Sequence, residues 1–234
     1  SSMGDTINFI IGQGVGLFNN NPWSGNLNNV DKYSGYWMNL DEDITFSYLL
    51  DGESVISPPV EYNITGGNNL VSYLGKDGCA TIDALNDEDN FNFIIGQGVG
   101  LFNNEGVWSG NLNNLNREKG YWMNAVEADP AFTWGDCSAN TLSKSEPFAN
   151  IPEALRFTQS TEQAFYLIKD INIDGQAPQQ GDILLAYNND ILVGSVEYDG
   201  AYTPIPVMGR DISPQAEGFC EVGEIPSIKL YKAN

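Results

Sequence analysis

Short runs in which apolar and polar residues alternate dominate the chain and predict a mainly β fold. The first of them, Asn8–Asn20, is rich in Ile, Val and Phe and has no helical period. Counted by strand parity, it carries Gly12, Gly14 and Gly16 on one face. We therefore expect one long strand whose glycine stripe is covered by a tryptophan of the same module, with a ligand groove as the alternative.

A tandem duplication organises the first part of the chain. The segment Asn8–Asn20 returns without change at Asn92–Asn104, and the blocks WSGNLNN and GYWMN return after it at Trp108–Asn114 and Gly120–Asn124. Repeats of this length are small domains rather than single turns of a solenoid. The duplication favours a modular surface protein over an enzyme with a single site.

Changes in composition along the chain predict repeat module 1 at residues 1–58, repeat module 2 at 59–136, a linker at 137–154 and a C-terminal β-sandwich-like domain at 155–234. Module 2 opens with a candidate strand, Asn69–Leu74, and a short candidate helix, Thr81–Leu85. Module 1 has no counterpart of either, so we expect it to be N-terminally incomplete. Its sheet should expose an unpaired edge suited to strand addition by a partner, unless it borrows a strand from Val55–Tyr62 or from a neighbouring chain.

Glycine, asparagine and proline punctuate the C-terminal domain at regular intervals, which is typical of an antiparallel sandwich. The candidate strands are Leu155–Thr158, Ala164–Lys169, Asp182–Tyr187, Ile191–Glu197, Ile205–Met208 and Ser227–Tyr231. Turns between them are expected at Asn188-Asn189 and Asp199-Gly200.

Composition narrows the classes of function. The chain has 31 acidic and 10 basic residues, a formal net charge of −21, which disfavours nucleic acid and anionic membranes as partners. No apolar run approaches the ~20 residues that span a bilayer, so no membrane insertion is expected. Histidine is absent, which removes Ser-His-Asp catalysis and histidine-ligated metal sites. At most one internal disulfide can form among Cys79, Cys137 and Cys220, and their spacing leaves the pairing open.

Four blocks of module 2 resemble, in their order, a module of secreted surface proteins of marine bacteria and of structural proteins of marine phages. They are Gly67–Ser72 (GNNLVS), Ile94–Val99 (IIGQGV), Trp108–Leu112 (WSGNL) and Gly120–Trp122 (GYW). Four blocks of the C-terminal region resemble a domain that often follows such modules: QAFY from Gln163, GDILLAY from Gly181, DILVG from Asp190 and IKLY from Ile228. Gln13 and Gln97 stand where that module usually has an acid. The resemblance implies a structural or adhesive setting without defined catalytic residues.

One acidic motif raises the question of a metal. Asp170, Asn172 and Asp174 form D-x-N-x-D-G, the opening of a calcium-binding loop. The twelfth position, which should be Glu, is Gly181, so an EF-hand is excluded. We favour a hairpin turn at Asp174-Gly175, while calcium is the one cofactor that the sequence suggests.

Aromatic residues supply the candidate ligand-binding positions. We select Trp23 and Tyr36 in module 1 together with their counterparts Trp108 and Tyr121 in module 2. If these residues form a binding surface, the duplication would present two similar sites and would gain affinity through avidity. Core packing is the competing explanation for most of the aromatic residues.

Together these patterns predict a non-catalytic structural, adhesive or recognition segment of a larger extracellular or virion-surface protein. The expected partners are other modules of the parent protein, with a glycan or a cell-surface ligand as a further class. A carbohydrate-binding accessory module is the first alternative. The second is a carboxylate-dependent hydrolase that uses the acidic runs Asp41–Asp43 and Asp87–Asp89, although solvated turns explain both runs more simply.

Overall fold

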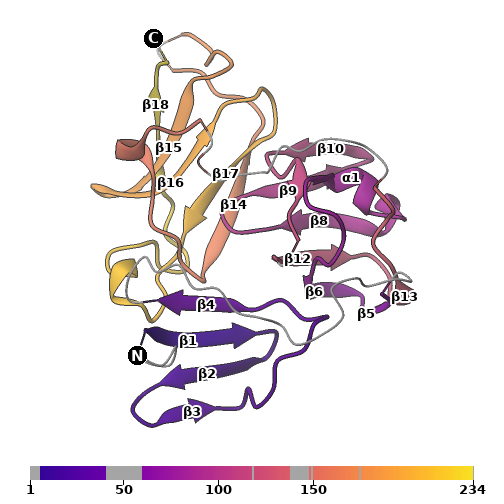
Figure 1. Ribbon diagram of the computed structural model, residues 1–234. Coiled ribbons are helices and arrows are strands. Elements are labelled where there is room, and N and C mark those ends of the chain that lie inside the picture. The colour runs from indigo at the N-terminus through magenta and orange to yellow at the C-terminus, as the bar shows by residue number, and fades with distance from the viewer. Residues whose placement is uncertain are drawn as a thin grey trace. The chain divides into compact units, whose positions relative to one another are not determined.

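The computed structural model describes residues 6–40, 60–117, 119–137, 148, 150–173 and 175–233. It confirms the mainly β fold, which is built from antiparallel sheets (Figure 1). The chain divides into two compact units, Ser1–Ile94 with Asn114–Lys144 and Ile95–Asn113 with Ser145–Asn234. No helix in the described part of the chain is long and apolar enough to cross a membrane.

The first sheet consists of the strands of module 1. They are β1 (Ile7–Gly12), β2 (Val15–Asn19), β3 (Trp23–Gly25) and β4 (Trp37–Leu40). Their order is β3-β2-β1-β4, so β3 and β4 form the two edges of the sheet (Figure 1). β1 and β2 are antiparallel, with Gly12 opposite Val15, and only Gln13 and Gly14 connect them.

The expected long strand with a glycine stripe is therefore wrong. The segment folds back at Gly14, whose φ of 72° is the left-handed conformation that short hairpin turns use. The side chains nearest to the neighbouring glycines are not tryptophans. A Cβ atom added to Gly12 would meet Tyr36 at 3.1 Å, and one added to Gly16 would meet Phe18 at 2.9 Å.

Module 2 builds a similar sheet with one strand more. Its order is β10-β9-β8-β12-β6, formed by β6 (Gly67–Ser72), β8 (Phe91–Ile95), β9 (Gly100–Asn104), β10 (Val107–Gly110) and β12 (Gly120–Ala125). Two smaller pairs join β7 (Cys79–Ala80) to β11 (Asn114–Leu115) and β5 (Tyr62–Ile64) to β13 (Asp129–Phe132). The expected short helix is α1 (Thr81–Ala84), and a 3-10 turn follows at Glu88–Asn90. By compactness β9 and β10 belong to the second unit.

Aromatic side chains form the core of the first unit. Trp134 contacts Tyr62, Tyr73 and Phe132 edge to face, with ring centroids 5.1 to 6.2 Å apart. Contacts of this kind add about 0.5–1.5 kcal/mol each beyond the burial of the rings. This cluster packs among the elements that precede β8 and follow β12, so it belongs to module 2.

One disulfide resolves the pairing that the sequence left open. Cys79 in β7 bonds to Cys137, with Cα atoms 5.6 Å apart and a sequence separation of 58 residues. Cys220, in the second unit, is a thiol. Burial, together with the nearby Glu224 carboxylate, raises the pKa of this thiol, which makes Cys220 a poor nucleophile at neutral pH.

The C-terminal domain consists of two antiparallel sheets. β14 (Gln163–Ile168) pairs with β17 (Thr203–Met208), and β15 (Ile183–Asn188) lies between β16 (Ile191–Glu197) and β18 (Ser227–Tyr231). These strands confirm the sequence predictions, except that Leu155–Thr158 is wrong. That segment begins at the last residue of a 3-10 turn, Glu153–Leu155, and continues without regular structure. Most of the expected linker lies outside the described residues.

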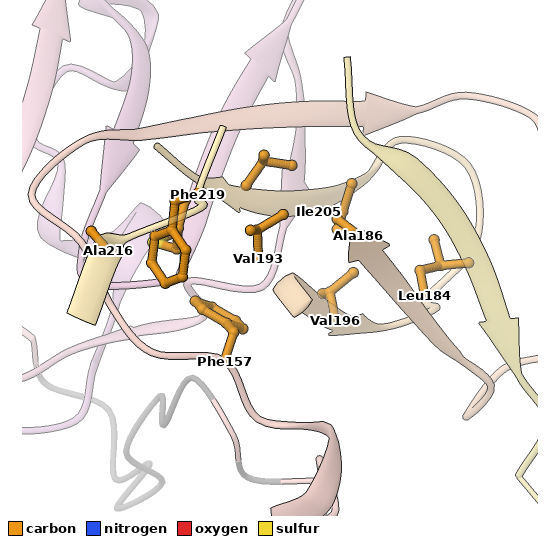
Figure 2. Close-up of a cluster of buried hydrophobic side chains, with 10 residues drawn as sticks. Phe157, Leu184, Ala186, Val193, Val196, Ile205, Ala216 and Phe219 are labelled. Atoms are coloured by element: carbon orange, nitrogen blue, oxygen red, sulfur yellow. The ribbon is translucent and has the colours of Figure 1, made fainter. Parts of the chain in front are cut away.

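Buried apolar side chains from both sheets form the core of this domain. Figure 2 shows Phe157 and Phe219 close to Val193, with Leu184 at the other end of the cluster. Val193 and Leu184 are completely buried. Because full burial of such a side chain stabilises a fold by about 1.5–3 kcal/mol, this cluster accounts for an independent core.

A salt bridge ties the end of the chain to the start of β15. Lys232 Nζ lies 2.9 Å from Asp182 Oδ2, and the Asp182 side chain is only 4% exposed. The Gln179 N–H donates to the same oxygen at 2.8 Å, and the Ala233 N–H donates to Oδ1 at 3.1 Å. The Gln179 hydrogen bond first, and then Lys232, hold the pKa of Asp182 below its ordinary value of 3.8.

This lowered pKa makes the stability of the C-terminal domain depend on pH. The ionised carboxylate stabilises the fold above pH 3.8, and that contribution is lost as the pH falls toward the lowered pKa. We expect Asp182→Asn to lower stability at neutral pH and to flatten the acid limb of the stability curve, in urea denaturation at about pH 3, 5 and 7. The exposed Asp190→Asn is the control and should leave the curve unchanged. An unchanged acid limb in Asp182→Asn would contradict this role.

Candidate functional site

Strand β6 has both of its edges occupied, and it joins the two modules within the first unit. On one side it pairs with β12 in antiparallel register. The other side, which we call the outer edge of β6, consists of the backbone groups of Asn68, Leu70 and Ser72. Hydrogen bonds from module 1 cover this outer edge.

The side chain of Gln13 takes the place of a strand at the outer edge of β6. Its Nε2 donates to the Asn68 carbonyl at 2.9 Å, and the Leu70 N–H donates to its Oε1 at 2.8 Å. One amide thus supplies the donor and the acceptor that a residue of a neighbouring strand would supply. The tight turn between β1 and β2 presents Gln13 for this contact.

The stretch Tyr33–Gly35 continues the contact along β6. The Gly35 N–H donates to the Leu70 carbonyl at 3.1 Å, and the Ser72 N–H donates to the Tyr33 carbonyl at 2.9 Å. An isolated antiparallel bridge between Ser34 and Val71 lies between these two bonds. Module 1 therefore pairs with β6 much as a sixth strand would.

Sequence reasoning did not identify Gln13 as a contact residue. It placed Gln13 in the middle of the expected long strand Asn8–Asn20, on the face opposite the glycine stripe. The available signal was the Gly-Gln-Gly sequence, which also suits a two-residue hairpin turn that projects its polar residue outward.

We expect Gln13→Ala to lower the free energy of unfolding of the first unit by about 1 kcal/mol, because it removes an exposed hydrogen bond to Asn68 and a part-buried one to Leu70. Gln97 provides a matched control. It has the same sequence neighbours and is exposed like Gln13, but it makes no hydrogen bond within the described part of the chain. Gln97→Ala should therefore change stability by less than about 0.5 kcal/mol in the same urea titration. Equal losses in the two variants would show that Gln13 has no special role.

The edge of module 1 that corresponds to the β6 side of module 2 carries no strand among residues 6–40 and 60–117. β12 lies between β8 and β6, whereas β4 pairs with β1 and ends its sheet. Met123 in β12 is 0% exposed, and its counterpart Met38 in β4 is 42% exposed. Among the described residues, β4 is thus the last strand of its sheet, and the unpaired edge of module 1 stays a prediction. The segment Val55–Tyr62 was the alternative source of a covering strand, and its residues before 60 lie outside the described structure.

Tyr36 and Tyr121, which the sequence suggested as ligand-binding residues, each hold the loop that precedes them. The Asp31 N–H donates to the Tyr36 hydroxyl at 3.1 Å, and the Asn116 N–H donates to the Tyr121 hydroxyl at 2.9 Å. Tyr121 is 3% exposed, and burial raises its pKa to about 12. Tyr121 is therefore a core residue and leaves the set of candidate ligand-binding positions, whereas Tyr36 is half-buried.

Trp23 and Trp108, the other two candidates, lie in β3 and β10 and are both half-buried. β3 and β4 are opposite edges of their sheet, so the structure does not bring Trp23 and Tyr36 together. Trp108 and Tyr121 belong to different units. Trp23 and Tyr36 thus do not form the aromatic platform that a sugar-binding site in module 1 would need.

The acidic motif that begins at Asp170 contains a turn. The Gly175 N–H donates to the Asn172 side-chain oxygen at 2.8 Å, so the side chain of Asn172 closes the turn. Asp174 lies outside the described residues. In the ranges that the structure describes, no group of three or more Cys, Asp or Glu side chains gathers to hold a metal. Calcium binding by Asp170, Asn172 and Asp174 stays a prediction.

The acidic runs do not form a described catalytic pair. Asp87 and Asp89 are exposed beside the 3-10 turn that follows α1, and Asp41–Asp43 lies outside the described residues. Burial would raise the pKa of the Asp31 and Asp211 carboxyl groups, but hydrogen bonds to each outweigh it and lower both values. A general acid needs the opposite shift.

Comparisons of the chain with protein-family models, with curated proteins and with solved structures gave no match. The resemblance of the repeat to surface modules of marine bacteria and phages therefore stays a prediction.

Proposed function

We propose that the chain is a non-catalytic structural and adhesive segment of a larger extracellular or virion-surface protein. The observation that carries this proposal is the joint between the modules, in which Gln13 and Gly35 bond to the outer edge of β6. Such a joint lets one small β module brace the next through hydrogen bonds to the main chain of β6. A chain of modules connected in this way can carry load or project a binding surface.

The disulfide and the charge of the chain support an extracellular setting. A bond between Cys79 and Cys137 forms and persists in oxidising compartments. The net charge of −21 keeps the protein soluble and repels anionic surfaces. Both features suit a protein that works outside the reducing cytosol.

The geometry offers less support for the two rival functions. A carbohydrate-binding module needs exposed aromatic rings on one surface, and Tyr121 is buried while Trp23 and Tyr36 occupy opposite edges of a sheet. A hydrolase needs two carboxylates across a cleft, one of them with a raised pKa. The pKa values of Asp31, Asp182 and Asp211 are all lowered, so none of these three carboxyl groups suits the role of the acid.

Pulling on the two ends of the whole chain in a single-molecule force experiment tests the load-bearing role. We expect Gln13→Ala to lower the force at which the first unit yields, and Gln97→Ala to leave it unchanged. The same material should show no saturable binding on a glycan array and no turnover of glycoside or peptide substrates. Equal unfolding forces in both variants would contradict the load-bearing role of the joint. Saturable glycan binding would favour the carbohydrate-binding module, and turnover that a single carboxylate substitution abolishes would favour the hydrolase.

A further inference from the structure

The two copies of the module show the same edge in two states. Residues 35–39 and 120–124 share the sequence GYWMN, so β4 and β12 present the same chemistry. In module 2 this edge is covered by β6, and in the described part of module 1 it is not. The second copy thus shows which kind of partner the edge of the first copy accepts.

Strand alternation identifies the backbone groups that face this partner. The backbone N–H and C=O groups of Leu70 and the N–H of Ser72 face module 1. Because these groups alternate in direction along a strand, the backbone groups of Asn69 and Val71 face β12. In the register of β6 and β12, Asn69 lies opposite Met123 and Val71 lies opposite Tyr121. The corresponding groups of module 1 belong to Met38 and Tyr36.

The exposure of the side chains also differs between the two copies. Met38 is 42% exposed where Met123 is 0% exposed, and Ile10 is half-buried where its counterpart Ile94 is 0% exposed. An unpaired edge beside uncovered apolar side chains is a template for strand addition.

We propose that β4 accepts, in antiparallel orientation, an extended segment of the β6 type from another polypeptide. Its chemistry follows from β6 itself, Gly-Asn-Asn-Leu-Val-Ser, which is uncharged and places alternate residues on the two faces of the sheet. An uncharged segment also meets no repulsion from the acidic run that follows Leu40 in the sequence. A second copy of this chain is not the expected donor, because its own β6 is flanked on both edges. The inference rests on the structural role proposed above and adds the class of partner.

A labelled peptide with the sequence of residues 66–74 tests the proposal by fluorescence anisotropy with the whole chain. We expect saturable binding and slower amide exchange of Met38 when the peptide is present. N-methylation of the peptide at the positions of Asn69 and Val71 should weaken binding about tenfold or more, because it removes the hydrogen bonds to β4. N-methylation at the position of Leu70, which points away from β4, should leave the affinity within about twofold.

Protein variants give a second check. Met38→Asp should abolish binding, while Asp at the exposed loop position Val30 should not change it. No saturable binding, equal effects of the two N-methyl peptides, or a Met38 amide that is already protected without peptide would overturn the proposal. Self-association of the chain that Met38→Asp removes would overturn the choice of donor. Failure of the peptide with the Gln13 result intact would remove the external partner and leave the structural role standing.

Discussion

Met123→Ala should lower the free energy of unfolding of the first unit by about 2–5 kcal/mol, whereas Met38→Ala should lower it by less than about 1 kcal/mol. The two methionines occupy the same position in identical GYWMN blocks. Met123 is fully buried, and Met38 is 42% exposed. Truncating the buried side chain costs its transfer free energy and also leaves a cavity. Truncating the exposed side chain costs less, because that side chain is partly in water already and leaves little or no cavity.

Urea denaturation of the two variants and the wild type, with amide exchange to assign the signal to the first unit, measures this difference. The comparison needs no external reference, because each methionine controls for the local sequence of the other. Losses of similar size would mean that both copies are covered to the same extent. The two modules would then not differ in the way that the open edge of β4 requires.

Loss of the disulfide should have a comparable effect. Replacing Cys79 and Cys137 by serine should lower the stability of the first unit by about 4 kcal/mol, because a cross-link over 58 residues restricts the unfolded chain by about that amount. Chemical denaturation of the double variant measures the loss. Cys220→Ser is the control, since that thiol forms no bond and lies in the second unit.

Thiol counting checks the pairing separately. The denatured oxidised protein should react with one equivalent of a thiol reagent, and the reduced protein with three. A stability loss in Cys220→Ser that matches the double variant, or three reactive thiols without reduction, would contradict the bond between Cys79 and Cys137.

The strands of the C-terminal domain could be predicted because their signals are local. Ile191–Glu197 and Ser227–Tyr231 match β16 and β18 in both bounds. Apolar runs of strand length end there at turn residues, and Asn189 and Gly200 adopt the positive φ angles that such turns use. Leu155–Thr158 has the same apolar character but follows a 3-10 turn, which a short pattern of residues does not reveal.

The structure of the first repeat was harder to predict because its sequence pattern fits two different structures. Alternating glycines fit a smooth strand by parity and a hairpin by turn chemistry, and the hairpin wins at Gly14. The role of Gln13 depends on Asn68 and Leu70, which are more than fifty residues away in the sequence. Contacts at that distance come from tertiary packing and leave no local signal.

The burial of the ligand-binding candidates could not be predicted from local sequence either. Tyr36 and Tyr121 have identical neighbours on both sides, yet one is half-buried and the other is in the core. The difference comes from the elements that cover β12, including β6, and not from the tyrosines themselves. In the described residues, β4 ends its sheet where β12 pairs with β6, and the expectation that module 1 as a whole lacks this strand stays a prediction.

Amide hydrogen exchange at Met38 and Met123 tests the central claim, that the two modules differ by one covering strand. We expect the Met123 amide, bonded to β6, to exchange only when the first unit unfolds, and the Met38 amide to exchange by local opening, faster by at least about a hundredfold. Equal protection of the two amides in the whole chain without added partner would show that the edge of β4 is covered, and would contradict the account.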